Sequence, residues 1–502
     1  MAFPIVNSII SWFLKKRIHQ IELFLKYPND VQEELLLKLM ATAKRTEFGK
    51  EHQFSSIKNY TEFAKLVPIQ RYESFEPLIE RCRKGEQNLF WPTPIKWFAK
   101  SSGTTNAKSK FIPVSNEALE YCHMKAGKDM LCLYINNNEE TKLFTGKGLK
   151  LGGSSDIYED NNSYFGDLSA IITENLPFWA DYSSAPSLEV AMMSEWETKM
   201  EAIIDETIHE DITSLVGVPS WMLVLLNRVL ERTGKDHILE VWPNLEVYFH
   251  GGVNFNPYRE QYKKIIPKKD FKYYETYNAS EGFFAIQDRN GSKELLLMLD
   301  YGIFYEFIPM SEYQGENSTA IPLSQVKENI NYAILITTNS GLWRYLIGDT
   351  IKFTSLKPYR IKITGRTKHH INVFGEELII ENAEEALKLA CEKTEASIID
   401  YTVGPIFMDH KKSGGHEWII EFNKAPDSLS YFTELLDNAL KSINSDYEAK
   451  RYHNMTLNSP KIHIARKGLF YDWLKEKGKL GGQHKIPRLS NSRDFVEELL
   501  KL

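Results

Sequence analysis

The chain has 502 residues, of which 42% are hydrophobic and 25% are charged. These are proportions of an ordinary globular protein, and they exclude a disordered, collagen-like or low-complexity chain. Its 61 basic and 67 acidic side chains give a formal net charge of −6, which argues against a dedicated nucleic-acid binder. At about 100–200 residues per domain, we expect roughly two to four domains.

The four cysteines and the N-terminal stretch bear on the compartment. No two cysteines have CxxC spacing, which favours a reducing compartment over a disulfide-built secreted scaffold. The apolar stretch from Ala2 to Leu14 precedes Lys15, Lys16 and Arg17, whereas a signal peptide has its positive charges first. It is also shorter than the roughly 20 apolar residues that span a bilayer. We expect an amphipathic helix packed on the body, with membrane-surface contact as the alternative, in a soluble cytoplasmic protein.

The first predicted helix follows Asn29 and Asp30, because Asp30 and Glu33 have the spacing of a capping box. The apolar residues at helical spacing are Val31, Leu35, Leu39 and Ala43. A short apolar run predicts a strand from Ile95 to Ala99, directly before a loop of Gly, Ser and Thr.

The middle of the chain alternates helix and strand patterns. Glu195 to Arg232 contains long helical patterns, and Leu245 to Phe249 is predicted to be a buried strand that ends at Gly251 and Gly252. Residues 293–366 are short β-rich runs separated by turns, which predicts a largely antiparallel sheet or barrel. The predicted strands there are Leu295 to Met298, Ile303 to Ile308, Tyr332 to Thr337, Trp343 to Ile347 and Tyr359 to Ile363.

The chain turns polar after Gly365 and Arg366, and we place a hinge there. The elements predicted beyond it are a helix from Ala383 to about Cys391 capped by Asn382, a half-buried strand with Trp418, Ile420 and Phe422, a helix from Ser430 to Ile443, a strand from Lys461 to Leu469, and a last helix bearing Phe495, Val496, Leu499 and Leu500. The predicted fold class is therefore mixed α/β. A large N-terminal domain (residues 1–367) has β-sheets flanked by helices and a barrel-like part, and a small α+β domain covers residues 368–502.

Ser101 to Lys110 is the strongest local motif. Four of its first five residues carry hydroxyls, Gly103 lets the backbone bend, and two lysines, Lys108 and Lys110, lie close behind. Small residues let a loop approach phosphate oxygens, to which backbone N–H groups, hydroxyls and a lysine can donate. A polar surface turn is the alternative, since Ser/Gly/Thr turns are common.

Two further motifs follow strand patterns. Tyr277 to Gly282, placed in a loop after the run Phe271 to Thr276, offers a ring that can stack on a base and a carboxylate that can hold Mg²⁺. In Trp343 to Asp349 a strand is predicted to end in Gly-Asp, and an aspartate there can accept hydrogen bonds from both ribose hydroxyls. Ordinary strand-end turns are the alternative for both.

The last motif, Gln483 to Arg488, lies in a basic stretch behind Gly481 and Gly482. A lysine in such a loop can swing onto a phosphate or a carboxylate, which makes Lys485 a candidate. A solvated basic loop is the alternative.

The four motifs, in this order, resemble the adenylate-forming superfamily. Within it the chain is most similar to the auxin-responsive promoter (Gretchen Hagen type) family of acyl-acid-amido synthetases, in a shorter bacterial-type form. The similarity runs over essentially the whole chain and rests on SSGTT followed by Lys110, on Tyr277 to Glu281, on Arg344-Tyr345-x-x-Gly348-Asp349 and on Lys485-x-Pro487-Arg488. Ala107 stands where the family usually has Gly, and Asn278-Ala279 differs from its Y-x-S-S-E form, although both changes keep the residues small.

The resemblance implies ATP and Mg²⁺ as cofactors. The implied ATP-binding residues are Ser101, Ser102, Gly103, Thr104 and Thr105 at the phosphates, Gly251, Gly252 and Tyr277 at the adenine, Ser280 on the phosphate side, and Asp349 with Arg366 at the ribose. Glu281 is implied to hold Mg²⁺ and Lys110 to assist by its charge. Lys485 is implied to bridge the α-phosphate and the attacking carboxylate.

The implied reaction has two steps. A carboxylic acid attacks the α-phosphate of MgATP to give an acyl-adenylate and pyrophosphate, and an amine, most simply an amino acid, then displaces AMP to give an amide. The small domain is implied to rotate between the steps. A ligase that forms a coenzyme A thioester remains an alternative, as does an inactive nucleotide- or acyl-acid-binding protein, although Glu281, Asp349 and Lys485 are all present. The expected partners are small molecules without nucleic acid or membrane span; the oligomeric state is open, a monomer being one option.

Other candidates are weaker. The candidate lining of the acyl pocket consists of Tyr134, Phe178, Trp179 and Met222. No G-x-S-x-G stretch occurs, and Cys122 and Cys132 are expected to pack inside a helical segment. His410 and His416 lack further zinc ligands at a suitable spacing, so we expect solvated or capping histidines.

Overall fold

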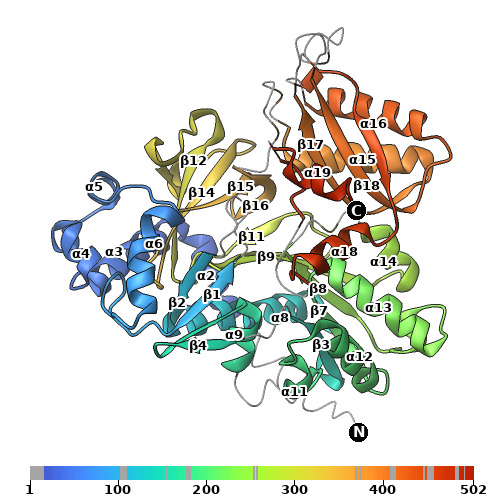
Figure 1. The fold of residues 1–502 in the computed structure, drawn as a ribbon. Coiled ribbons are helices and arrows are strands. Elements are labelled where there is room, and N and C mark those ends of the chain that lie inside the picture. Colours follow the sequence, from blue (N-terminus) through green and yellow to red (C-terminus); the bar gives the residue numbers. More distant parts are fainter. Residues whose placement is uncertain are drawn as a thin grey trace.

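The fold is that of a computed structural model. It describes residues 16–101, 110–152, 157–176, 183–252, 255, 258–367, 371, 376, 378–407, 414–444, 447–448, 451, 457–480, 486–490 and 492–502. Figure 1 shows a large N-terminal part built around a long twisted sheet and a smaller C-terminal part that lies against one side of it. The mixed α/β fold class with a large and a small domain is confirmed.

The first described part of the chain is helical, and α3 to α6 lie at the left edge of the molecule in Figure 1. Its helices are α2 (Ile18–Lys26), α3 (Pro28–Ala43), α4 (Glu47–Glu51), α5 (Tyr60–Leu66) and α6 (Tyr72–Arg83). The predicted start of α3 is wrong by three residues, because Pro28, whose missing N–H costs nothing in the first turn, begins the helix in place of a capping box at Asp30. The buried face also includes Leu36 and Met40, whereas Val31 and Leu35 are partly exposed. The predicted helix from Ala2 to Leu14 lies outside the described residues.

A four-stranded sheet of order β2-β1-β5-β4 carries the first motif. Its strands are β1 (Trp97–Ser101), β2 (Lys110–Val114), β4 (Tyr158–Asp160) and β5 (Ser163–Gly166). Strand β1 begins two residues later than predicted and pairs antiparallel with β2, so that Ser101 lies opposite Lys110 at the two ends of the motif. Short helices α7 (Asn116–Ala118) and α9 (Leu168–Glu174) and the longer α8 (Lys125–Asn137) accompany this part.

The central sheet has twelve strands in the order β13-β12-β14-β15-β16-β11-β10-β9-β8-β7-β3-β6. Its parallel part consists of β3 (Lys147–Leu151), β6 (Ser184–Ala185), β7 (Ile212–Gly217), β8 (Val247–Gly251) and β9 (Lys272–Ala279). The helices around it are α8, α11 (Leu188–Ala191), α12 (Trp196–Thr207), α13 (Pro219–Thr233) and α14 (Arg259–Ile265). Strand β7 lies inside the stretch predicted as helical, because its six residues are too short to interrupt the periodicity of the helices on either side.

The remaining strands of this sheet are antiparallel, as predicted. They are β10 (Gly282–Ile286), β11 (Leu295–Leu297), β12 (Ile303–Pro309), β13 (Ile321–Pro322), β14 (Asn331–Thr338), β15 (Tyr345–Leu356) and β16 (Tyr359–Arg366). The prediction that a strand ends at Gly348-Asp349 is wrong, because β15 continues for seven residues beyond Asp349. Tyr277 was likewise expected in a loop, but it lies inside β9.

The C-terminal part packs two helices on a three-stranded sheet of order β17-β18-β19. Its elements are α15 (Ile380–Thr394), β17 (Ser397–Ile406), β18 (Gly415–Lys424), α16 (Leu429–Ile443), β19 (Lys461–Ala465), α18 (Leu469–Glu476) and α19 (Asp494–Leu499). Asn382 is not the N-cap of α15 but its third residue, where its side chain accepts from the N–H of Ile379. Strand β18 is buried on both faces over its first eight residues, because helices cover one side and α18 with α19 the other. Among the described residues, no helix is long and apolar enough to cross a membrane.

Candidate functional site

Three side chains from three strands of the central sheet meet at one carboxylate. The phenol of Tyr277 on β9 donates to Oδ2 of Asp349 on β15 at 2.8 Å, and Nε of Arg366 on β16 donates to Oδ1 at 2.6 Å. Asp349 is 6% exposed and Tyr277 is 5% exposed. Burial and the neighbouring carboxylate of Asp349 hold the pKa of Tyr277 well above its ordinary value, so the phenol stays protonated.

The pairing of β15 with β16 explains how Asp349 and Arg366 come together. They are direct partners in the antiparallel register. The preceding Gly348 has a φ of +92°, in the left-handed region that favours glycine. The N–H of Thr367 donates to the carbonyl of Gly348 at 2.7 Å and fixes the end of β16 beside this turn of the backbone. Gly348 is therefore needed for this conformation of the backbone, and Asp349 is needed for the contact with Arg366.

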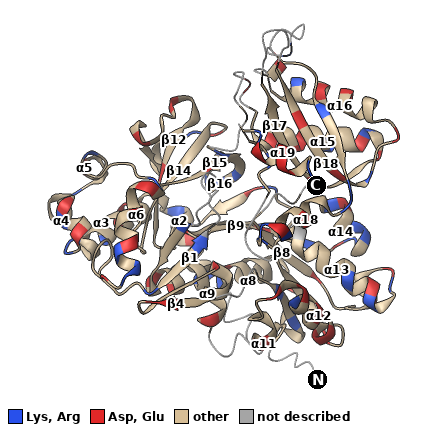
Figure 2. Cartoon of the chain, in the orientation of Figure 1, with Lys and Arg blue, Asp and Glu red and all other residues tan. Residues whose placement is uncertain are grey.

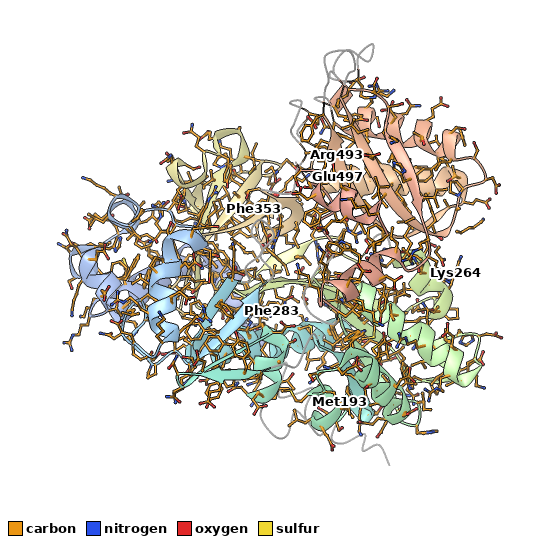
Figure 3. The ribbon with its side chains drawn as sticks, viewed as in Figure 1. Met193, Lys264, Phe283, Phe353, Arg493 and Glu497 are labelled. Carbon is orange, nitrogen blue, oxygen red and sulfur yellow. The ribbon has the colours of Figure 1, made fainter. Side chains whose placement is uncertain are left out.

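Glu281 lies in the tight turn between β9 and β10, close to this cluster. Burial raises the pKa of Glu281, a shift that the charges of Lys110 and Arg366 oppose and the charge of Asp349 reinforces. The turn rests on a buried helix segment, because the N–H of Phe283 (labelled in Figure 3) contacts Sγ of Cys122 at 3.2 Å. The expectation that Cys122 is a packing residue is thereby confirmed.

Ser280, next to Glu281, is 3% exposed, and its hydroxyl has no hydrogen-bond partner in the described part of the chain. A buried polar group without a partner carries a free-energy cost, and a bound ligand can remove it. This hydroxyl, Glu281 and Lys110 fit one end of an anionic ligand. Lys110 begins β2, and its Nζ lies 5.3 Å from the centroid of the ring of Tyr72, the first residue of α6.

Strand β8 ends at Gly251 beside β9, and Gly252 follows it. A Cβ atom on Gly251 would lie 2.6 Å from Oγ1 and 2.7 Å from the carbonyl oxygen of Thr276, which leaves no room for a side chain. Gly252 has a φ of +84°. The carboxyl ends of parallel strands form the usual ligand site of such sheets, so the two glycines present bare backbone at the place where a ligand is expected.

The structure brings together six of the predicted site residues: Lys110, Tyr277, Ser280, Glu281, Asp349 and Arg366. The side chain of Ser101, the residues Ser102, Gly103, Thr104 and Thr105, and Lys485 lie outside the described residues, as do Phe178, Trp179 and His410. Their predicted roles stay predictions.

Two predicted assignments are wrong. The pocket candidate Tyr134 packs under the sheet against Phe249 and Tyr274 and donates to Glu246 at 3.0 Å. His416 is neither solvated nor capping, because it is 1% exposed and its Nε2 lies 2.9 Å from Oε1 of Glu376. Met222 is fully buried beside Gly217 at the end of β7, which is compatible with a pocket wall.

Sequence reasoning missed the residues that hold the aspartate strand in place. Arg344, at the entrance to β15, donates to both oxygens of Glu306 at 3.0 and 3.1 Å and to the carbonyl of Val67 at 2.7 Å. Both side chains are at least 94% buried, and Arg344 has a φ of +45°. The RY-x-x-GD spacing was visible in the sequence, but no local signal identifies Glu306 as the partner.

The residues present fit a magnesium nucleotide. Mg²⁺ is usually bound by one or two carboxylates together with phosphate oxygens and water. Glu281 supplies one such carboxylate, next to the orphaned hydroxyl of Ser280. Across the described ranges, no group of three or more His, Cys, Asp or Glu side chains forms an all-protein metal site.

Three family models match successive parts of the chain. The model of the GH3 family N-terminal domain matches residues 17–271, that of the GH3 family central domain residues 296–366, and that of the GH3 family C-terminal domain residues 381–494. Among curated relatives, the indole-3-acetic acid-amido synthetase GH3.3 of Arabidopsis thaliana is 20% identical over 96% of this chain and 93% of its own length. The jasmonoyl–L-amino acid synthetase JAR6 of Nicotiana attenuata is 22% identical over 94% and 93%.

Solved structures share the fold. The GH3.15 acyl acid amido synthetase superimposes with a TM-score of 0.80 at 16% identity, covering 97% of this chain and 96% of the other. A 2-hydroxyisobutyryl-CoA ligase in its postadenylation state gives a TM-score of 0.60 at 10% identity, covering 94% and 92%. At these identities the structural likeness shows the fold alone.

Proposed function

The chain belongs to the GH3 family, and from this premise we propose that it activates a carboxylic acid with ATP and transfers the acyl group to an amine, forming an amide, AMP and pyrophosphate. Its relatives are named as amido synthetases, which confirms the predicted family and the prediction of an AMP-forming ligase. The observation that carries the proposal is the carboxylate of Asp349, held by Tyr277 and Arg366 beside Glu281 and Lys110.

In the first step the residues bind and orient MgATP. Asp349 accepts hydrogen bonds from the ribose hydroxyls, since each carboxylate oxygen has a second lone pair beyond those used by Tyr277 and Arg366. The ring of Tyr277 and the backbone of Gly251 and Gly252 border the adenine. Residues 101–105 bind the phosphates.

Positive charge is needed because the acid and ATP are both anionic. Lys110 supplies it from β2, and Lys485 supplies it from the C-terminal domain. Glu281 would hold Mg²⁺, which neutralises phosphate charge as pyrophosphate departs. The C-terminal domain, proposed to cover residues 368–502, then rotates so that Lys485 leaves and the amine reaches the acyl-adenylate.

The proposal includes small-molecule partners and a cytoplasmic location. The acid and the amine are small molecules, in line with the names of the relatives. None of the four cysteines, all of them described, forms a disulfide, and three are buried, as expected for a reducing compartment.

Acid-dependent exchange of labelled pyrophosphate into ATP tests the first step. Pooled carboxylic acids should support exchange in the wild type, and Lys485→Ala should lose about 10²–10³-fold of it. Lys475→Ala, which removes an exposed lysine on α18, serves as the matched control. Exchange that is independent of added acid, or equal in the two variants, would contradict the proposal.

A further inference from the structure

Arg488 belongs to the last sequence motif but has no part in the scheme above. It lies three residues after Lys485, within the described stretch 486–490. The side chain of Arg488 is 15% exposed, so its charge is largely removed from water and needs partners inside the protein. The identity of those partners determines what the guanidinium can do.

Residues 486–490 run along the edge of the C-terminal sheet. The N–H of Val403 on β17 donates to the carbonyl of Arg488 at 2.9 Å, and the N–H of Ser490 donates to the carbonyl of Val403 at 3.0 Å. Strand β18 pairs with β17 on its opposite edge. The chain that follows Lys485 is therefore fixed to the C-terminal domain.

Two neighbours on β17 hold the Arg488 side chain inside its own domain. Its Nη1 forms an ion pair with Oδ1 of Asp400 and donates to the carbonyl of Tyr401 at 3.1 Å. The guanidinium also lies 4.7 Å from the centroid of the Tyr401 ring. A planar guanidinium can donate hydrogen bonds in its plane while its face stacks on a ring. These contacts lie within one domain, so they hold the side chain in place when that domain moves.

The other terminal nitrogen of Arg488 bonds across the domain boundary. Its Nη2 donates to the phenol oxygen of Tyr258 at 3.1 Å. Tyr258 is 2% exposed and packs in an apolar cluster of the large domain, so the acceptor is fixed. Figure 2 shows α14, which begins one residue after Tyr258, directly below the C-terminal domain. The bond therefore forms only when the C-terminal domain has an orientation close to this one.

Tyr258 lies on the loop that leads away from the nucleotide site. This loop begins after Gly251, where β8 ends, and continues into α14. Its first residues, Gly251 and Gly252, are the backbone proposed above to border the adenine. The bond between Arg488 and Tyr258 therefore attaches the end of the last sequence motif to the loop that borders the proposed nucleotide site.

The chain before Lys485 also contacts both domains. Leu480, beyond α18, packs against the apolar cluster of the large domain that contains Tyr258 and against the cluster of the C-terminal domain that contains Ile486. Ile486 itself is 6% exposed. The residues on either side of the stretch that carries Lys485 are thus anchored, one of them at the boundary between the domains.

We propose that Arg488 is a positioning residue, which places Lys485 for the activation of the acid by joining the C-terminal domain to Tyr258. This inference rests on the proposed function, in which Lys485 bridges the α-phosphate and the attacking carboxylate. Three residues of extended chain span at most about 10–11 Å, so an anchored Arg488 limits how far the backbone of Lys485 can move. When the domain rotates, the bond to Tyr258 breaks and Lys485 leaves with the domain, which admits the amine.

Because Arg488 acts through Lys485, it should affect the rate of acid activation more than the binding of ATP. Acid-dependent pyrophosphate exchange by the full-length protein measures this half-reaction. Arg488→Met should lower its kcat by about 10–100-fold, the range for a lost hydrogen bond to a charged group, with little change in the KM for ATP. Arg488→Lys keeps the charge but makes fewer of the contacts, so it should recover part of the rate.

The second half-reaction is measured separately, by supplying the purified acyl-adenylate of an acid that supports exchange together with pooled amino acids. Arg488→Met should form the amide at nearly the wild-type rate, because Lys485 is not needed for this step. Equal losses in the two half-reactions, or unchanged exchange, would overturn the inference. Absence of acid-dependent exchange in the wild type would instead remove the proposed function.

Two double variants test the route by which Arg488 acts. In Lys485→Ala, adding Arg488→Met should cause little further loss of exchange, because the group that Arg488 positions is already absent. Tyr258→Phe should lower exchange about 10-fold, and Tyr258→Phe/Arg488→Met should be no slower than Arg488→Met alone. Losses that multiply in either pair would show independent effects and overturn the inference.

Arg493→Met is the matched control for loss of stability. Arg493, labelled in Figure 3, donates to Glu417 at 2.7 Å and to the carbonyl of Pro405 at 2.8 Å, and both partners belong to its own domain. This variant should unfold at a lower temperature yet keep the wild-type exchange rate below that temperature. A loss of exchange as large as in Arg488→Met would trace both effects to stability and overturn the inference.

Discussion

Asp349 is held before a ribose arrives, because Tyr277 and Arg366 each donate to a different oxygen of its carboxylate. Such preorganisation removes the entropy cost of fixing the side chain when the nucleotide binds. The same contacts also tie three strands of the sheet together. A substitution at any of the three residues should therefore weaken nucleotide binding and also lower stability.

Tyr277→Phe keeps the ring and removes the hydroxyl that donates to Asp349. A hydrogen bond to a charged group contributes about 1.5–3 kcal/mol, so we expect the KM for ATP to rise about 10-fold or more. Asp349→Asn should have a larger effect because it removes the charge as well. ATP titrations of acid-dependent pyrophosphate exchange measure both, and a KM unchanged in both variants would contradict the assigned ribose site.

Glu281 should make stability and activity depend on pH in opposite senses. Because burial raises the pKa of Glu281 in the folded protein, its contribution to stability is complete below the ordinary value of 4.5 and is lost as the pH rises through the folded value. Glu281→Gln should thus be more stable than the wild type at neutral pH and equal to it below pH 4.5, while losing pyrophosphate exchange. Urea unfolding at a series of pH values measures the first effect, and parallel pH dependences would rule out Glu281 as its source.

At the scale of elements, the close contact of β8 with β9 shapes the site. Gly251→Ala would place a Cβ 2.6–2.7 Å from two atoms of Thr276, one of them backbone, so the strands must separate. Overpacking of this kind costs about 1–3 kcal/mol, and we also expect weaker ATP binding.

The control for Gly251→Ala is Gly127→Ala in α8, where nothing lies within 4 Å of the added Cβ. Alanine is favoured over glycine inside a helix by about 1 kcal/mol, so this variant should gain stability. Thermal unfolding compares the two, and equal stability changes in both variants would refute the assigned role of the strand contact.

Among the described residues, hydrogen bonds and the ring contact of Trp221 with Tyr471 join the two parts of the molecule. Besides Tyr258 with Arg488 and Gln261 with Ile398, the Tyr471 hydroxyl bonds to Glu197. Polar contacts of this kind are typical of domains that move relative to each other. They are consistent with a C-terminal domain that changes position between two half-reactions.

The double variant Tyr258→Phe/Gln261→Ala removes two of these bonds and keeps the buried ring at position 258. We expect the C-terminal domain to separate more readily, which raises the radius of gyration in small-angle X-ray scattering of the ligand-free protein. Lys263→Ala, an exposed position on the same helix, should scatter as the wild type does. If the double variant had the same radius of gyration as the wild type, these bonds would not determine the position of the C-terminal domain.

The sequence predicted those features that depend on short stretches of neighbouring residues. The strand-rich region 293–366, the late α+β part and the order of the motifs follow from short patterns, and the structure and the family models agree with them. It also predicted which residue types gather at the site. Tyr277 and Asp349 are 72 residues apart, yet the motif comparison assigned both to one nucleotide.

The structural features that the sequence did not predict depend on contacts between segments far apart in the chain. Strand β7 is hidden between two helices, and the continuation of β15 through Asp349 is set by its pairing with β14 and β16. The register of β8 and β9 places His250 beside Glu275, and α14 brings Arg259 onto the ring of Phe255. The sequence patterns of β8 and β9 do not predict which residues of other elements lie beside them.

The central claim is tested most directly by identifying the products of one reaction that contains every candidate acceptor. The purified protein is incubated with MgATP, a pool of carboxylic acids, the proteinogenic amino acids and coenzyme A, and the products are analysed by mass spectrometry. We expect acyl–amino acid conjugates and AMP in equal amounts, both lost in Lys485→Ala. Acyl-coenzyme A as the acid-dependent product, or no AMP with any acid, would contradict it.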